Sequence, residues 1–539
     1  MRPPNWRPPI ELSPEEERVM TRIKKAKLFI FLRHNRHHLF NEELQLELAT
    51  IFKDSTVGQC PIPPAQLALA LILQAYTGIS DDEVIEVLVM DRRWQLVLDC
   101  LDCQKPPFSK GTLVNFRQLL INKGLDQRLI ERTVEIAKEK GGFHSVKLRA
   151  ALDSSPLWGS GKVEDTYNLL GHTLKKAVRL MASAQGRSLE NVASVVGAQM
   201  VFGSSLKAAL DLDWDDPEQR SQALETLLNT FNTVEDLIEK KKTSDSLEIV
   251  QATLEVGREI EAQNVTFDAS GQPKLTKGVA PNRRISVEDP EMRHGRNCRS
   301  QRFNGYKRHV LTDLDIGVVR AVGVTAANLP EATVTDALAI DLKAQKVELV
   351  ELHIDRAYLS SEWVKQREEN LQIFCKAWPV RNGELFEKTA FILDWDKWEI
   401  KCPNQITIPF APAKVVKFPP QECAICPLQQ RCTTSKTSRS ISIHPDEALM
   451  QELRERQSTR VGRAELRQRS AVEHTHSECG SIGLRDQARY LGQRKNLFDL
   501  RRVAVVHNLQ GKSSDAAFYS AAGCLNLAEA RGMGLPIKT

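Results

Sequence analysis

The stretch LRAALDSSPLWGS, residues 148–160, is an apolar run that meets an acidic residue. Leu148 and Leu152 share one face of a strand expected over 147–153, and Asp153 lies on the other face. A carboxylate at the end of a buried strand is costly unless a hydrogen bond, a basic partner or a metal ion compensates it. The role of Asp153 therefore depends on whether other carboxylates converge on it.

A second expected strand ends in the same way. In VELHIDRAYLSSEWV, residues 350–364, Leu352 and Ile354 share one face, whereas Asp355 lies on the other and precedes a turn. If the two strands are neighbours in one sheet, both carboxylates can reach the same divalent ions. The sequence therefore predicts a two-aspartate site.

The segments between these strands predict a particular fold class. Residues 305–313 and 317–328 flank a short turn and read as an antiparallel hairpin, and residues 331–345 read as a helix. Strand, hairpin, helix and strand is the order of the RNase H-like fold, a mixed α/β fold in which the strands that carry these acids are adjacent. The long helical stretch at about 165–263 is then an insertion after the first strand.

A third carboxylate is expected from a later helix, RAELRQRSAVEHTHSEC, residues 463–479. Glu473 follows Arg469 by four residues, so the two side chains share a face. An arginine there would favour the ionised form of Glu473 and could also contact a phosphate. Glu465 and Glu478 lie on the same helix, and spacing alone does not exclude them.

Composition limits the class of protein. The 539 residues are 41% hydrophobic and 27% charged, with no apolar stretch of the roughly 20 residues that a membrane span needs. The N-terminus has no apolar signal segment, so we expect a cytoplasmic protein. The net charge of +5 is too small to identify a partner. The arginine-dense stretches 283–309 and 454–470 could attract phosphates or could be solvated surfaces.

Four of the eleven cysteines cluster late in the chain. A cytosolic chain rarely uses cysteines for disulfides, and a C-x-x-C pair with one further cysteine on each side fits a structural zinc site. Four free, partly buried thiols are the alternative. The cysteines are Cys402, Cys423, Cys426 and Cys432.

Periodicity and composition divide the chain into segments. Capped helical patterns indicate an all-helical N-terminal domain, and the cysteines mark an insertion before the last catalytic helix. The expected divisions are an N-terminal extension (1–38), a helical DNA-binding domain (39–142), the first strand of the core (143–162), a helical insertion (163–282), the continued core (283–378), a cysteine-containing insertion (379–450), C-terminal catalytic helices (451–515) and a tail (516–539).

Several motifs together resemble bacterial insertion-sequence transposases of the DDE class, in the branch with an N-terminal helical DNA-binding domain. The resemblance covers nearly the whole chain. Each motif alone is weak, but the set is specific. The motifs are ALDSSPLWGSGKVEDTYNLL (151–170), DPEMRHGRNCRSQRFNGYKRHVLTD (289–313), HIDRAYLS (353–360), R-x-x-x-E (469–473), ARYLGQRKN (488–496) and HNL (507–509).

The resemblance implies a function and its residues. Asp153, Asp355 and Glu473 would be the catalytic acids, holding two Mg²⁺ ions for which Mn²⁺ is a substitute, and Arg469 would be the helix arginine. The protein would bind transposon ends and target DNA in the nucleoid as a homodimer, cut strands and join 3′ hydroxyl ends to the target.

The sequence departs from the family at one expected DNA-contacting position, because Gly480 stands where relatives often have a lysine. Other basic residues would then supply the phosphate contacts. The candidates near the end of the chain are Arg485, Arg489, Arg494 and Lys495, and those on the hairpin are Lys307, Arg308 and His309. Two alternatives stay open, an RNase H-like nuclease without strand transfer and an inactive DNA-binding relic.

Overall fold

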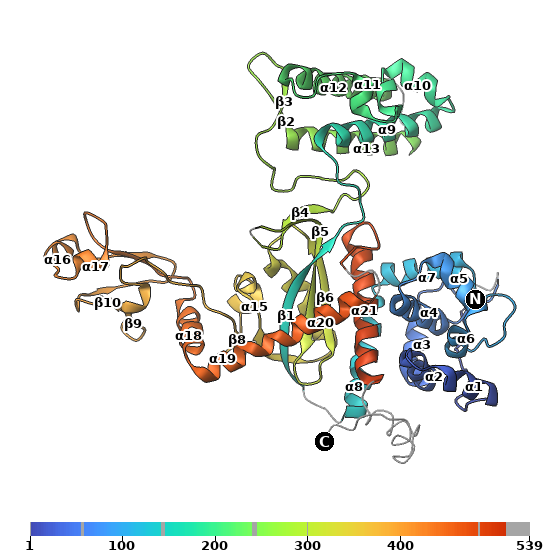
Figure 1. Ribbon diagram of the computed structural model, residues 1–539, viewed down its shortest axis with the longest axis horizontal. Helices are drawn as coiled ribbons and strands as arrows, with labels where there is room; N and C mark the ends of the chain where they lie inside the picture. Colours follow the sequence, from blue (N-terminus) through green and yellow to red (C-terminus); the bar gives the residue numbers. More distant parts are fainter. Residues whose placement is uncertain are drawn as a thin grey trace.

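The structure is a computed structural model that describes residues 2–54, 59–141, 146–239, 245–298, 300–482 and 486–513. A mixed sheet lies at the centre, with N-terminal helices on one side, a helical insertion at one end and the cysteine-containing insertion on the other side (Figure 1). The expected tail at 516–539 lies outside the described residues.

The central sheet has the strand arrangement predicted for an RNase H-like core. β1 pairs antiparallel with β5 and parallel with β7; β6 pairs with β5, and β8 with β7. The predicted hairpin and the predicted adjacency of the two acid-bearing strands are confirmed. The strands are β1 (Lys147–Trp158), β4 (Arg293–Arg296), β5 (Arg302–Asp313), β6 (Val319–Ala326), β7 (Glu348–His353) and β8 (Gln372–Phe374).

Different helices cover the two faces of this sheet. Leu152 and Leu311 pack with side chains from α14 (Thr335–Ala344), α15 (Glu362–Lys365) and α18 (Glu447–Ser458). On the other face, Ala151 and Val310 share a core with α8 (Asp126–Gly141), α20 (Ser470–Ser481) and α21 (Gln493–Ser513). Because side chains alternate along a strand, Asp153 belongs to the face covered by α20 and α21.

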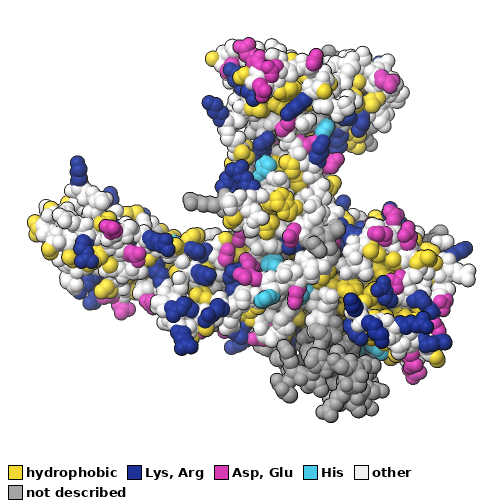
Figure 2. Space-filling model, in the orientation of Figure 1, with side chains coloured by type: hydrophobic (Ala, Val, Ile, Leu, Met, Phe, Trp, Pro, Cys, Tyr) yellow, Lys and Arg dark blue, Asp and Glu magenta, His cyan; other side chains and the backbone are white. Residues whose placement is uncertain are grey.

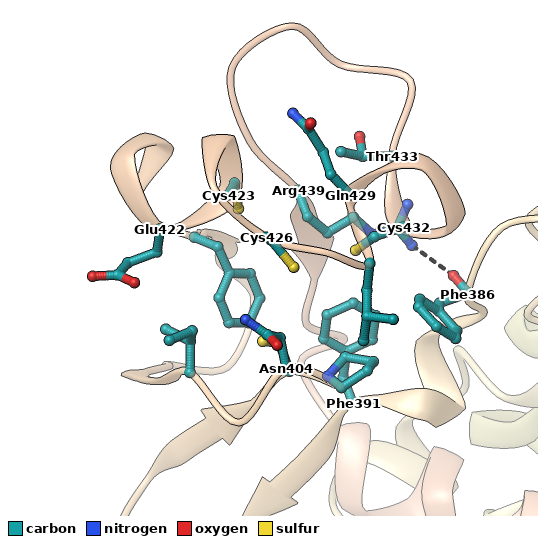
Figure 3. Close-up of a pocket in the computed structure, with 15 residues that line it drawn as sticks. Phe386, Phe391, Asn404, Glu422, Cys423, Cys426, Gln429, Cys432, Thr433 and Arg439 are labelled. Carbon is teal, nitrogen blue, oxygen red and sulfur yellow. Dashed lines mark hydrogen bonds between the residues drawn. The ribbon is translucent and has the colours of Figure 1, made fainter.

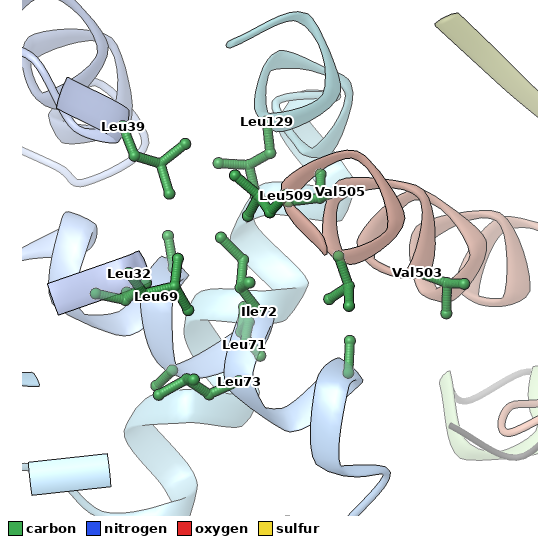
Figure 4. Packing of buried hydrophobic residues seen from close by; sticks show 14 of the residues in the cluster. Leu32, Leu39, Leu69, Leu71, Ile72, Leu73, Leu129, Val503, Val505 and Leu509 are labelled. Carbon is green, nitrogen blue, oxygen red and sulfur yellow. The ribbon is translucent and has the colours of Figure 1, made fainter. Parts of the chain in front are cut away.

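The N-terminal helices share their hydrophobic core with α21. Figure 4 shows leucines of α2 and α4 close to Val505 and Leu509 of α21. α4 is apolar on all sides and almost wholly buried, as expected for a helix enclosed by others. The helices are α1 (Pro14–Arg22), α2 (Lys27–Leu39), α3 (Glu42–Ala49), α4 (Pro64–Thr77), α5 (Asp81–Met90), α6 (Arg92–Leu98) and α7 (Lys110–Lys123).

The helical insertion forms a separate core away from the sheet (Figure 1). Phe231 in this core is only 1% exposed. The elements are α9 (Thr166–Gln185), α10 (Leu189–Val196), a 3₁₀ turn (Gln199–Phe202), α11 (Leu206–Leu210), α12 (Pro217–Glu239), α13 (Asp245–Asn264), β2 (Val265–Phe267) and β3 (Pro273–Leu275).

The cysteine-containing insertion has small sheets around an aromatic core that includes Phe391 and Phe418. Its elements are β9 (Ile392–Asp394), β10 (Glu399–Lys401), β11 (Thr407–Pro409), β12 (Val415–Lys417), α16 (Pro420–Ala424), α17 (Gln429–Cys432) and β13 (Ser440–Ser442).

Three local expectations differ from the structure. β1 does not end at Asp153 but continues to Trp158, because β5 is long enough to pair with it that far. The helix expected at 463–479 is divided into α19 (Arg460–Leu466), a 3₁₀ turn (Arg467–Arg469) and α20. Residues 1–38, expected as an extension, include α1 and all but the last residue of α2, and Ser13 and Glu16 form a capping box at the start of α1.

Glycine is required at position 305, where the backbones of the paired strands β1 and β5 approach closely. Gly305 has φ of 148°, and a Cβ placed there would collide with the main chain of Leu157 and Gly159. Glycine is the residue that tolerates such a close approach of two backbones.

Candidate active site

The register between β1 and β7 brings the two predicted aspartates together. Ala151 lies opposite His353 in the parallel pair, and Asp153 and Asp355 each follow two residues later. Because side chains alternate, each aspartate lies on the same face as the residue two positions before it. Burial raises the pKa of Asp355, and the nearby Asp153 carboxylate adds to the rise. The charge of the Asp153 carboxylate therefore acts on Asp355.

Arg469 links Asp153 to the third predicted acid. Its Nη1 donates to Asp153 Oδ2 at 2.7 Å, and its Nη2 donates to Glu473 Oε1 at 2.6 Å. The Glu473 side chain is 55% exposed, and that of Asp153 is 16% exposed. One guanidinium thus lies between two of the three acids, and the predicted pairing of Arg469 with Glu473 is present.

The charge of Asp153 needs a positive partner. Burial raises the pKa of Asp153, the Arg469 guanidinium opposes that rise, and the Glu473 carboxylate adds to it. Three carboxylates near one another repel when all are ionised. A cationic group, either arginine or a metal ion, is what stabilises such a set.

A metal site is not preformed by these side chains. Within the residues that the structure describes, no three His, Cys, Asp or Glu side chains are arranged to hold a common ion. The donor set still fits a hard divalent cation, because Asp153, Asp355 and Glu473 offer only carboxylate oxygens, which Mg²⁺ prefers. Arg469 currently occupies the position between Asp153 and Glu473.

A second set of polar contacts ties α20 to β1. His476 Nε2 lies 3.1 Å from the Asp153 main-chain oxygen, and its Nδ1 lies 3.2 Å from Ser155 Oγ. Arg308 Nε donates to the same Ser155 Oγ at 2.6 Å. The sequence reasoning missed His476 and Ser155; the only signal available was that His476 follows Glu473 by three residues, one helical turn.

The hairpin residues expected to contact DNA are engaged inside the protein. His309 is fully buried between Tyr358 Oη at 2.8 Å and Thr325 Oγ1 at 2.9 Å, and burial lowers its pKa to about 3. Lys307 donates to the Leu329 main-chain oxygen at 2.9 Å. Arg308 is 6% exposed. None of these three side chains presents the exposed cation that a phosphate contact needs.

The candidates near the end of the chain have different surroundings. Arg489 donates to the Ile79 main-chain oxygen, and Arg494 donates to Asp126 at 2.6 Å, so both join the core to the N-terminal helices. Lys495 is exposed. Arg485 lies outside the described residues. Of the described candidates in this group, Lys495 is the one with a freely exposed side chain.

The four clustered cysteines line one cavity in the cysteine-containing insertion, beside Phe386, Phe391 and Phe418. Figure 3 shows the sulfurs of Cys423, Cys426 and Cys432 directed into the same space. Burial raises the pKa of Cys432, and the other three thiols add to the rise. The four cysteines that cluster in the sequence therefore also lie together in the structure, although their thiols do not form a closed metal site.

Three protein-family models match the chain. A "Transposase domain (DUF772)" model matches residues 19–119, and two models described as "Transposase DDE domain" match residues 267–382 and 399–511. No curated protein and no solved structure matches it. The three matches together with the fold define a DDE transposase. The chain belongs to the insertion-sequence DDE transposases.

Family membership has consequences for partners and cofactors. A DDE transposase binds DNA and depends on divalent metal ions.

Across the described parts of the chain, none of the helices is both long and apolar enough to cross a membrane.

Proposed function

We propose that this protein binds the ends of an insertion sequence, cleaves the DNA strands and joins the 3′ hydroxyl ends to target DNA. The observations that support the proposal are the position of Asp153 and Asp355 on neighbouring chain segments, set by the β1–β7 register, and the Arg469 guanidinium that joins Asp153 to Glu473 of α20. Cleavage and joining are both in-line displacements at phosphorus, so one set of acids can serve both.

We propose Mg²⁺ as the natural cofactor, with Mn²⁺ as a substitute. When bound, a pair of such ions supplies activation of the attacking oxygen and stabilisation of the leaving oxygen. Asp153 would contribute oxygens to both ions, Asp355 to one and Glu473 to the other. Mg²⁺ takes only one or two carboxylates and keeps several waters, which fits a set of three carboxylates.

The chain itself supplies charge balance and orientation. Arg469 forms ion pairs with both Asp153 and Glu473 in the structure, and a guanidinium released from such pairs can contact a DNA phosphate through two parallel hydrogen bonds. Because pairing two transposon ends requires two catalytic sites, we propose that the DNA complex contains a homodimer.

An excision and integration assay tests the proposal. The substrate is a plasmid that carries the DNA flanking this gene on both sides, incubated with purified protein and Mg²⁺. We expect cutting at both ends and joined products from the wild type, whereas Asp355→Asn retains DNA binding and loses both reactions. Cutting without joining would instead identify a nuclease, and binding without either reaction would identify a relic.

We also propose a structural zinc ion among Cys402, Cys423, Cys426 and Cys432. The four thiols line one cavity, and Zn²⁺ bound by thiolates would relieve the cost of burying them. Metal analysis of the purified protein should give one zinc per chain, and Cys426→Ser should lower that content without loss of Mn²⁺ binding at the acids. A zinc-free wild type would show that the cluster is four free thiols.

A further inference from the structure

His476 is a buried side chain of α20 that faces β1. It is 8% exposed, and both of its ring nitrogens contact β1, one at the Asp153 main-chain oxygen and one at Ser155 Oγ. Glu473 precedes it by one helical turn on the same helix. The histidine therefore connects the helix that carries one acid to the strand that carries another.

The hydrogen bonds have a fixed direction. A main-chain oxygen can only accept, so His476 Nε2 carries the proton and donates to Asp153 at 3.1 Å. In the neutral ring Nδ1 is then the acceptor of a hydrogen bond that the Ser155 hydroxyl donates, at an Oγ–Nδ1 distance of 3.2 Å. Ser155 Oγ in turn accepts from Arg308 Nε at 2.6 Å, which leaves each donor with an acceptor.

The hydrogen bonds extend beyond the His476 ring. Arg308, whose Nε donates to Ser155, also donates from Nη2 to Asp486 Oδ1 at 2.6 Å. Together, the hydrogen bonds of His476, Ser155 and Arg308 join β5, β1, α20 and the segment that precedes α21.

We propose that His476 is a positioning residue that fixes Glu473 relative to Asp153 by clamping α20 to β1. This inference rests on the proposed function, in which both acids hold the divalent ions. Arg469 connects the same two acids, but through long side chains and with Glu473 exposed, so it cannot set the helix position alone. A short, buried ring bound at both nitrogens restricts the helix much more tightly.

Mn²⁺ binding, followed by electron paramagnetic resonance of the full-length protein, tests the inference without DNA. We expect His476→Ala to weaken Mn²⁺ binding by about 10-fold or more, the usual cost of removing a group that orders metal ligands. His476→Gln should recover most of the affinity, because its amide nitrogen can donate to the Asp153 oxygen. The matched control is His474→Ala, since His474 is an exposed histidine on the same helix and should bind Mn²⁺ like the wild type.

Two further variants keep the result decisive. If His476→Ala does not fold, Ser155→Ala removes only the acceptor of Arg308 and the donor to the ring, and a smaller loss of Mn²⁺ affinity is expected. If Asp355→Asn loses Mn²⁺ binding but the His476 and Ser155 variants bind Mn²⁺ like the wild type, the positioning role of His476 is refuted while the proposed metal site stands. Unchanged Mn²⁺ binding in Asp355→Asn would refute the proposed metal site itself.

Discussion

Arg469 donates to the Asp153 carboxylate at 2.7 Å across 316 positions of sequence. This ion pair places a positive charge at the point where the first predicted acid meets the helical segment that carries the third. Figure 2 shows acidic and basic side chains interspersed over the face of the molecule in view. Charge balance within the candidate site therefore depends on one arginine, and that dependence can be measured.

Arg469→Ala should shift the pH dependence of Mn²⁺ binding. Burial already raises the pKa of Asp153 and the guanidinium opposes that rise, so its removal raises the pKa further. Mn²⁺ needs the ionised carboxylate, so binding should be lost at a higher pH than in the wild type. Titrations at a series of pH values measure this midpoint. Arg463→Ala, an exposed arginine of α19, serves as the control, and an unshifted midpoint in Arg469→Ala would contradict the charge-balance role.

Asp126→Asn should loosen the contact between the N-terminal helices and the core. The Asp126 side chain is 1% exposed and accepts from Arg494 at 2.6 Å and from Arg501 at 3.1 Å. Removing one partner of a buried ion pair typically costs about 3 kcal/mol or more. Urea unfolding measures the change. Glu42→Gln, which breaks an exposed pair with Arg7, should cost under about 1 kcal/mol, and equal costs would argue against a specific role for Asp126.

Asp81→Asn should remove part of the acid sensitivity of folding. Burial would raise the pKa of Asp81, but hydrogen bonds from Arg117 and Gln74 lower it to about 2. A carboxyl whose folded pKa lies below its unfolded value, about 4, stabilises the fold above that value and loses this effect as the pH falls toward 2. The contribution is roughly 2 kcal/mol.

Urea unfolding at pH values between about 5 and 2 tests this expectation. The difference in the free energy of unfolding between the wild type and Asp81→Asn should be largest at the upper end and shrink toward the lower end. A difference that stays constant over this range would show that the ion pair with Arg117 does not lower the pKa of Asp81.

Gly305→Ala should destabilise the central sheet. A Cβ at this position would collide with the main-chain oxygen of Leu157, and the backbone cannot move away without breaking the β1–β5 pairing. Thermal unfolding should show a clear fall in the melting temperature. Gly111→Ala in α7 is the control, because the added Cβ meets only Ser109 Oγ at 3.7 Å and should leave stability unchanged or raised.

The paired aspartates were predictable because alternation along a strand depends only on the local chain. Leu148 and Leu152 identify the buried face of β1, and the same pattern before Asp355 identifies β7. The end of β1 was not predictable, since Asp153 and Ser154 look like a strand end until β5 is present to pair beyond them. The buried state of His309 was missed for a similar reason, because its partners Tyr358 and Thr325 come from other elements.

The sequence by itself determined the order of the strands, the neighbouring positions of Asp153 and Asp355 and the clustering of the cysteines, because these follow from periodicity and spacing; Glu473 stays a prediction from motif resemblance. Only the tertiary structure decided which basic residues face solvent and which polar side chains support the acids. Arg308, Arg494 and His476 look alike as isolated polar residues in the sequence. Their roles are set by partners more than 100 positions away, and contacts at that separation leave no local pattern.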